Sequence, residues 1–335
     1  MVQVRRQSTT IGLVIALVAA ASFGTSGAFL KPVLESGWSP AAAVTFRALI
    51  GAIVLLPFTL VALRGRWSAL WHARWRVLLM ALVGVAATQL VYITAISLVP
   101  ISTAILIEYM APLLLVGFAW IRSRKVPKVV VLVGSGVALV GLVLVVGPNG
   151  HGGVNVVGLI FAALGAVGCA VYYVIAAKPS EGLPPVALAG SGLVLGGLAL
   201  GAVGLTGLVP FRMHFGTVGL FGGHAPWWVP LVLVGLIGTG IAYAASITAS
   251  EILGSRLSSF MGLLEVVFAA LYAWLLLGQD LTVPQLLGGI LILGGIALVR
   301  AEKADPPLEA VPVTESVPTQ TTSGTQTISA SGSIK

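Results

Sequence analysis

The sequence predicts an all-α membrane protein with ten transmembrane helices, arranged as two five-helix repeats of inverted topology. Three observations support this fold class. Of the 335 residues, 58% are hydrophobic and only 8% are charged, whereas a soluble domain carries about 25% charged residues. The apolar residues fall into blocks that are long enough to cross a hydrocarbon layer of about 30 Å. Similar short motifs also recur in the two halves of the chain.

Ten apolar blocks have the length that a transmembrane helix needs, about 20 residues. Their expected limits are 11–30, 40–62, 76–98, 100–121, 127–147, 154–177, 185–207, 228–249, 256–277 and 281–300. Because Arg5 and Arg6 precede the first block, a secretory signal is its alternative interpretation. We favour a first span, since the apolar run is long for a signal and its removal would break the repeat.

Lysine and arginine gather in alternate loops, and such loops normally face the cytoplasm. They comprise Arg5, Arg6, Arg64, Arg66, Arg74, Arg76, Arg122, Arg124, Lys125, Lys128, Lys178, Arg256, Arg300 and Lys303. The opposite loops carry only Lys31 and Arg212. We therefore expect a multi-pass protein of the cell (inner) membrane with both termini in the cytoplasm.

The chain divides into four parts. These are a cytoplasmic N-terminus (1–10), a first repeat (11–147), a second repeat (154–300) and a tail (301–335). The tail is rich in Ser, Thr, Pro and Gln without an apolar period, so we expect it to be disordered and cytoplasmic. The longest outside connection, 208–227, contains three phenylalanines and is expected to lie on the membrane surface.

The repeat is visible in short motifs. Tyr92-Ile-Thr-Ala-Ile in span three resembles Tyr243-Ala-Ala-Ser-Ile in span eight, and Trp120 in span four matches Trp274 in span nine. Five spans are an odd number, so the second half must enter the membrane from the opposite side. Inverted repeats of this kind typically place a binding site near the midplane between the halves.

Three ionisable residues lie inside spans, where charges are costly and are functional candidates by default. At a rise of about 1.5 Å per residue, Glu108 lies about 12 Å from the outer face and Glu265 about 13 Å from the inner face. Arg47 lies about 10 Å from the outer face by the same count, so we expect it to pair with Glu108. The alternative is that these charges only fix the orientation of their helices.

Other residues complete the candidate site. Gln89, Tyr92, Tyr109, Tyr172, Tyr173 and Tyr243 could add hydrogen bonds to a central cavity, although each alone is more often a packing residue. Lys31 stands at the outer end of span one. Pro112, one turn after Glu108, is expected to kink span four and to free a backbone carbonyl. The glycines of span seven favour close packing within one bundle, while a homodimer is the alternative use.

Several classes of function are disfavoured. No metal or cofactor site is expected, because the four histidines fall in loops and Cys169 is the only cysteine. No hydrolase motif lies in a span and no nucleotide-binding motif occurs, so we expect neither an enzyme nor direct use of ATP. No basic stripe with aromatics suggests a nucleic-acid partner. The expected partners are a small-molecule substrate and the lipid bilayer.

Two stretches resemble the drug/metabolite transporter superfamily in its ten-span EamA branch. They are SFGTSGAFLKPVLESGWSPAAAVTFRALIGAIVLLP (22–57) and SRLSSFMGLLEVVFAALYAWLLLGQDLTVPQLLGGILILGG (255–295). The resemblance covers residues 11–300 and implies that Lys31, Arg47 and Glu265 occupy characteristic polar positions. Val266 stands where the family usually has proline, which puts a kink there in doubt. IEYMAPL (107–113) and the spacing from Arg256 to Glu265 look most like bacterial amino-acid exporters of the threonine/homoserine type.

The resemblance and the buried charges together predict a secondary-active transporter that exports small polar metabolites such as amino acids by alternating access. A carboxylate in the midplane cavity would bind a substrate ammonium or carry a proton. Two alternatives remain open. One is a multidrug or sugar-derivative efflux transporter, and the other is a non-transporting membrane scaffold or sensor, which the lack of a folded soluble domain disfavours.

Overall fold

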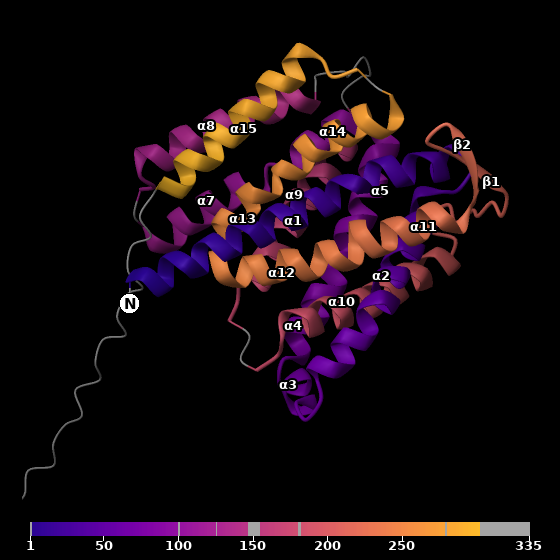
Figure 1. The fold of residues 1–335 in the computed structure, drawn as a ribbon, viewed down its shortest axis with the longest axis horizontal. Coiled ribbons are helices and arrows are strands. Elements are labelled where there is room, and N and C mark those ends of the chain that lie inside the picture. The colour runs from indigo at the N-terminus through magenta and orange to yellow at the C-terminus, as the bar shows by residue number, and fades with distance from the viewer. Residues whose placement is uncertain are drawn as a thin grey trace, which may run out of the picture. The chain divides into compact units, whose positions relative to one another are not determined.

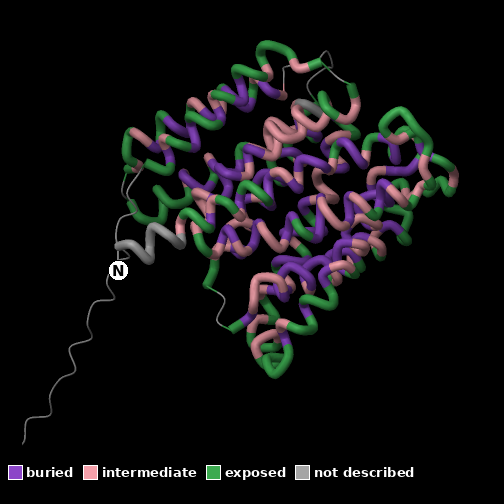
Figure 2. Tube along the Cα trace, viewed as in Figure 1, coloured by how far each residue is buried: buried purple, intermediate pink, exposed green. Residues whose placement is uncertain are grey.

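The computed structural model describes residues 2–99, 101–124, 126–146, 155–179, 182–278 and 280–301. The expected disordered tail therefore lies outside the described residues, apart from Ala301. Within the described residues, ten helical segments are long and apolar enough to cross a membrane, as the sequence predicts. Large apolar side chains on the outer faces are exposed, including Ile53, Ile121 and Ile290, whereas buried residues gather between the helices (Figure 2). This distribution fits a lipid surrounding.

The first half contains five spans and one short additional helix. Its elements are α1 (Val2–Glu35), α2 (Pro40–Ala62), α3 (Trp67–His72), α4 (Arg74–Leu79), η1 (Met80–Ala87), α5 (Thr88–Leu98), α6 (Ile101–Glu108), α7 (Ala111–Ser123) and α8 (Val129–Val146). The third span is one continuous rod of α4, η1 and α5, and the fourth combines α6 and α7. The helix α1 ends at Glu35, later than the limit of 30 that hydropathy predicts. We call the side of the bundle at which α1 begins the N-side.

The second half repeats this order. Its elements are α9 (Val156–Ala176), α10 (Pro185–Leu205), α11 (Trp228–Gly235), η2 (Leu236–Ile241), α12 (Ala242–Leu253), α13 (Ser255–Gly262), α14 (Leu264–Leu277) and α15 (Val283–Ala301). The connection 208–227 contains an antiparallel hairpin of β1 (Thr217–Leu220) and β2 (Gly223–Pro226), which the sequence did not lead us to expect. The hairpin lies beside the C-terminal end of α1 (Figure 1). There Phe29 of α1 contacts Phe221 in the turn of the hairpin.

Both halves carry a π-helical segment within their third span. The π-helical segments η1 and η2 occupy corresponding places in spans three and eight. In each, a threonine hydroxyl donates to the carbonyl five residues earlier: Thr88 to Val83 at 2.6 Å and Thr239 to Val234 at 3.0 Å. Isolated π-turns often mark functional sites, and this pair is repeated across the two halves.

Glycine permits the closest helix contacts, as expected for helices packed in lipid. On α8 and α15, Gly134 faces Gly295 and Gly141 faces Gly288, and a Cβ at any of these positions would collide with the facing backbone. On α10, Gly197 packs against Leu49 of α2. The glycines of span seven are thus used within the bundle.

The two halves interlock at their first helices. The helix α1 packs against α12 and α14 of the second half, and α9 packs in the corresponding way against α5 and α6 of the first half (Figure 1). The pairs α2–α10 and α8–α15 also join equivalent helices of the two halves. The midplane between the halves is therefore walled by helices from both repeats.

Candidate functional site

Span four is broken at the carboxylate. Glu108 is the last residue of α6, and Tyr109 and Met110 form a turn before α7 begins. Pro112 lies in the first turn of α7, where its missing N–H leaves the carbonyl of Glu108 without its helical partner. Span four is thus broken just before Pro112, and the proline stands at the start of the second helix instead of within a continuous one.

Span nine is interrupted at the equivalent place. The interruption falls at Leu263, whose N–H donates to the carbonyl of Phe260 at 3.1 Å and whose carbonyl accepts from Val266 at 3.2 Å. These shorter-range bonds tighten the helix by the 3₁₀ pattern and need no proline. The doubt raised by Val266 is therefore removed. Glu265 lies in the first turn of α14, where the helix dipole favours a negative charge.

The two breaks bring the carboxylates of opposite halves together. The hydroxyl of Tyr109, in the turn of span four, donates a hydrogen bond to the carboxyl of Glu265. The carboxylates of Glu108 and Glu265 repel each other, and the guanidinium of Arg47 attracts both. Arg47 and Glu108 are both described, yet they do not come within the 4.0 Å of an ion pair. The expected close ion pair between Arg47 and Glu108 is thus absent. Instead, the guanidinium of Arg47 attracts the carboxylates of both Glu108 and Glu265.

A glycine lies beside each carboxylate-bearing segment. A Cβ at Gly165 of α9 would lie 3.9 Å from the carboxyl carbon of Glu108. A Cβ at Gly24 of α1 would lie 3.1 Å from the backbone oxygen of Glu265. Each glycine opens a G-x-x-G motif, Gly24-Thr-Ser-Gly27 and Gly165-Ala-Val-Gly168. We did not infer this pair from the sequence, although the repeated motif was a usable signal.

Three of the predicted site residues line one cavity. Arg47, Gln89 and Tyr243 line it, and the cavity has about 10 Å³ of accessible volume, which is room for about one water molecule. Its other lining residues are Val44, Ala48, Val85, Leu193, Leu200 and Thr239. Tyr92 does not line this cavity but interacts electrostatically with Arg47 and both carboxylates.

Lys31 is separate from this cluster. Its ammonium group pairs with Glu35 at 3.8 Å on the same helix, and both side chains are exposed. Cys169 of α9 lies within electrostatic reach of both Glu108 and Glu265. Among the described residues, no group of three or more His, Cys, Asp or Glu is placed to hold a metal ion.

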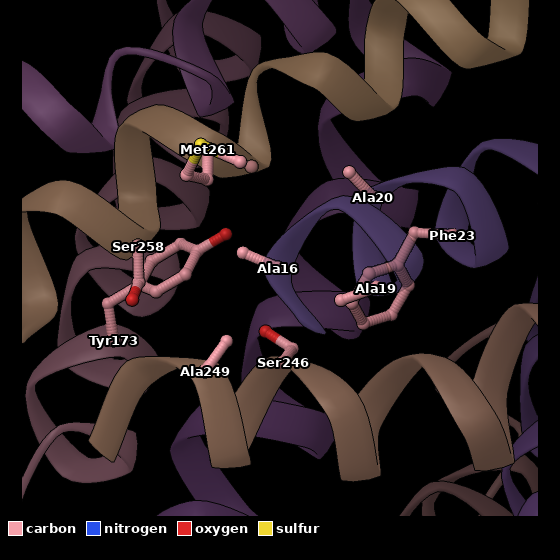
Figure 3. A pocket seen from close by; sticks show the side chains of 10 residues that line it. Ala16, Ala19, Ala20, Phe23, Tyr173, Ser246, Ala249, Ser258 and Met261 are labelled. Atoms are coloured by element: carbon pink, nitrogen blue, oxygen red, sulfur yellow. The ribbon is translucent and has the colours of Figure 1, made fainter. Parts of the chain in front are cut away.

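A second cavity, also with about 10 Å³ of accessible volume, lies between α1, α9, α12 and α13 (Figure 3). Its lining residues are near the N-side ends of α9, α12 and α13, whereas Arg47 lies near the opposite end of α2. The two cavities therefore lie toward opposite sides of the bundle.

Known proteins match this chain along almost its whole length. The EamA-like transporter family matches residues 10–147 and 156–301. The uncharacterized inner membrane transporter YicL of Salmonella typhimurium is 25% identical over 300 residues, covering 87% of this chain and 96% of that protein. An uncharacterized transporter of Archaeoglobus fulgidus is 25% identical over 290 residues, covering 85% of this chain and 95% of that protein.

A protein of known crystal structure shares the fold. Its TM-score is 0.67 at 22% identity, and the match covers 88% of this chain and 99% of that one. The ten spans, the repeated halves and the two matches to one family agree with each other. The chain carries ten helical segments, among its described residues, that are long and apolar enough to cross a membrane, and it belongs to the EamA-like transporter family.

Proposed function

We propose that the protein is a secondary-active exporter of small polar metabolites such as amino acids, and that it works by alternating access around Glu108 and Glu265. One observation carries the proposal: the two acids come from equivalent helix breaks in opposite halves, and both act on Arg47. Movement of one half against the other would change the distances between these three charged groups.

The charges in the cluster do not balance. When both carboxylates are ionised, Arg47 offsets only one of them, and an unpaired charge in a membrane interior is costly. A substrate ammonium or a proton would supply the missing positive charge. Competition between these two cations for the same carboxylates would couple export of a substrate to import of protons.

Both cavities are nearly closed in this state, because each has about 10 Å³ of accessible volume, which is room for about one water molecule. They lie toward opposite sides of the bundle, and alternating access would require each side to open in turn. The paired interruptions in spans three, four, eight and nine are suitable places for such a motion.

Counterflow in liposomes tests the proposal. Purified protein is reconstituted, and exchange of labelled neutral amino acids is measured with and without a pH gradient. We expect Glu108→Gln and Glu265→Gln each to lower the exchange rate at least tenfold and to remove its dependence on the gradient. Glu35→Gln, which changes an exposed acid outside the cluster, serves as the matched control. Unchanged flux and pH dependence in both cluster variants would contradict the proposal.

The direction of transport needs intact cells. Cells that overproduce the protein are compared with cells that lack it, and metabolites are measured inside and in the medium. Export predicts that one small polar metabolite is depleted inside and enriched outside on overproduction. Accumulation of that metabolite inside the cells would show an importer instead.

A further inference from the structure

We propose that the connection between spans two and three binds an anionic phospholipid, with the lipid phosphate on arginines and the upper part of the acyl chains on exposed tryptophan rings. The connection comprises α3, the turn before it and the start of α4, and it lies on the N-side (Figure 1). The residues that would hold the lipid are called here the N-side patch: Arg64, Arg66, Trp67, Trp71, Arg74 and Trp75. The patch is separate from the carboxylates, so its role does not depend on the transported solute.

Three positive charges lie on this patch. Arg64, Arg66 and Arg74 are exposed, and no Asp or Glu occurs between Glu35 and Glu108 in the sequence. Among the residues that the structure describes, no carboxylate forms an ion pair with any of the three arginines. Basic residues beside a membrane attract acidic headgroups, and a guanidinium matches two phosphate oxygens at once. The charge of the patch is therefore complementary to an anionic lipid.

Three tryptophans form an exposed stripe beside these charges. Trp67, Trp71 and Trp75 follow each other at intervals of four residues, and they are 54%, 70% and 66% exposed. Leu70 and Ala73 instead pack inward against the core of the bundle. Tryptophan is enriched at the level of the lipid headgroups, where its ring contacts hydrocarbon while its N–H stays in a polar layer. The stripe thus offers an apolar surface next to the arginines, as a phospholipid requires.

Arg74 joins the charged and the aromatic parts of the patch. Its guanidinium carbon lies 5.2 Å from the ring centroid of Trp71 and 5.8 Å from that of Trp75, which is within the range of a cation–π contact. Its Nη1 also donates to the carbonyl of Trp71 at 3.2 Å. A guanidinium has five N–H donors, so donors remain for a phosphate. Because the two rings hold the side chain in place, less entropy is lost when a headgroup binds.

The second half of the protein adds a cation to the same side. Arg76 of α4 donates to the carbonyls of Lys178 and Pro179 at 2.7 and 2.9 Å, and this contact holds the chain after α9 beside α4. The side chain of Lys178 is exposed. A headgroup on the N-side patch would therefore meet positive charge from both halves.

Native mass spectrometry tests the site. Purified protein in neutral detergent is titrated with phosphatidylglycerol or with phosphatidylcholine of the same acyl chains, and half-saturation by the first bound lipid is measured. We expect phosphatidylglycerol to bind at least about tenfold more tightly, because only it carries a net negative charge. The double variant Arg64→Gln/Arg66→Gln should weaken its binding about tenfold, which corresponds to about 1.4 kcal/mol.

Arg74→Lys tests the contribution of the stacked guanidinium. Lysine keeps the charge but has neither the planar fork nor the stacking surface of arginine. We expect Arg74→Lys to weaken phosphatidylglycerol binding severalfold and to leave phosphatidylcholine binding unchanged. Binding equal to that of the native protein would show that charge alone holds the lipid, which contradicts a site built on Arg74 and its two rings.

The matched control is Arg122→Gln/Arg300→Gln. Both arginines are exposed at the N-side ends of other helices, α7 and α15, so the control removes the same number of charges from the same side. We expect it to bind phosphatidylglycerol within about twofold of the native protein, because salt screens charges that are remote from the bound phosphate. Unchanged unfolding temperatures show that the variants are folded. Equal affinity of the native protein for the two lipids would overturn the proposal, and so would an equal loss in the control and in Arg64→Gln/Arg66→Gln.

Discussion

Glu265 depends on the opposite half of the protein for its hydrogen bond. Tyr109 donates to this carboxyl from the turn between α6 and α7. In a continuous helix the side chain of residue 109 would point about 100° away from that of Glu108, since an α-helix has about 3.6 residues per turn. The break frees Tyr109 from this constraint, so Glu108 at the end of α6 is followed directly by a hydrogen-bond partner for the second acid.

Loss of the Tyr109 hydroxyl is expected to slow transport. A hydrogen bond to a charged group contributes about 1.5–3 kcal/mol, so Tyr109→Phe should lower the exchange rate about tenfold or more while the protein stays folded. The measurement is initial exchange in liposomes, paired with the unfolding temperature. The control is Tyr272→Phe, which removes a hydroxyl from a ring stacked on Phe268 of the same helix, α14. Equal rates in the two variants would show that the bond has no role in transport.

Sequence reasoning at the residue scale identified charges better than contacts. The depths of Arg47, Glu108 and Glu265 follow from counting along helices, and the structure places the three within electrostatic reach of each other. The direction of Tyr109 could not be predicted, because it depends on a local break. Lys31 was expected near this site, but α1 continues to Glu35 and gives Lys31 an acidic partner one turn later.

The pair α8–α15 shows how an element is held in lipid. Between helices in a membrane the hydrophobic effect is weak, so close backbone approach and dispersion contacts must hold them. Glycines spaced seven residues apart on both helices (134 and 141, 288 and 295) provide that approach in an antiparallel pair. The glycine-rich last span was visible in the sequence, but the register that joins it to α8 was not.

Adjacent glycines on α15 give a direct test of this packing. Gly295→Ala would place a Cβ 2.6 Å from the carbonyl oxygen of Gly134, and overpacking of this kind costs about 1–3 kcal/mol. Gly294 has no atom within 4 Å of such a Cβ, so Gly294→Ala should be neutral or slightly stabilising. Unfolding temperatures in detergent should therefore fall for the first variant alone. A similar fall in both would show that helix backbone effects, and not the α8 contact, decide stability.

The hairpin is the element that sequence reasoning missed. Its turn is Phe221-Gly222, and both residues have positive φ angles, 49° and 81°. Turns of this kind usually carry Asn-Gly or Asp-Gly, which tolerate positive φ at little cost. Phenylalanine gives no such signal. The contact of Phe221 with Phe29 holds the turn against α1, a tertiary effect that local propensity does not contain.

At the scale of the whole molecule, hydropathy and counting were sufficient for the architecture. Each span needs a long apolar block in lipid, and an odd number of spans in each half forces inversion. The length of the apolar blocks and the number of spans are fixed by the chain itself, so they do not depend on how the helices pack. The exchange of first helices, with α1 against α12 and α14, is different. It depends on which small-residue faces fit together, and hydropathy does not distinguish one apolar face from another.

The orientation of the whole molecule in the membrane is the last prediction. The loop between α2 and α3 contains Arg64 and Arg66, on the N-side, and the hairpin connection contains a single cation, Arg212. Because positive loops are retained in the cytoplasm, we expect the N-side to be cytoplasmic. Alkaline phosphatase, whose disulfides form only outside the cytoplasm, should be active when inserted between Phe221 and Gly222 and inactive when inserted after Gly65. A green fluorescent protein fused after residue 335 should fluoresce, since the chain crosses an even number of times. Activity after Gly65 with none in the hairpin would show the opposite orientation.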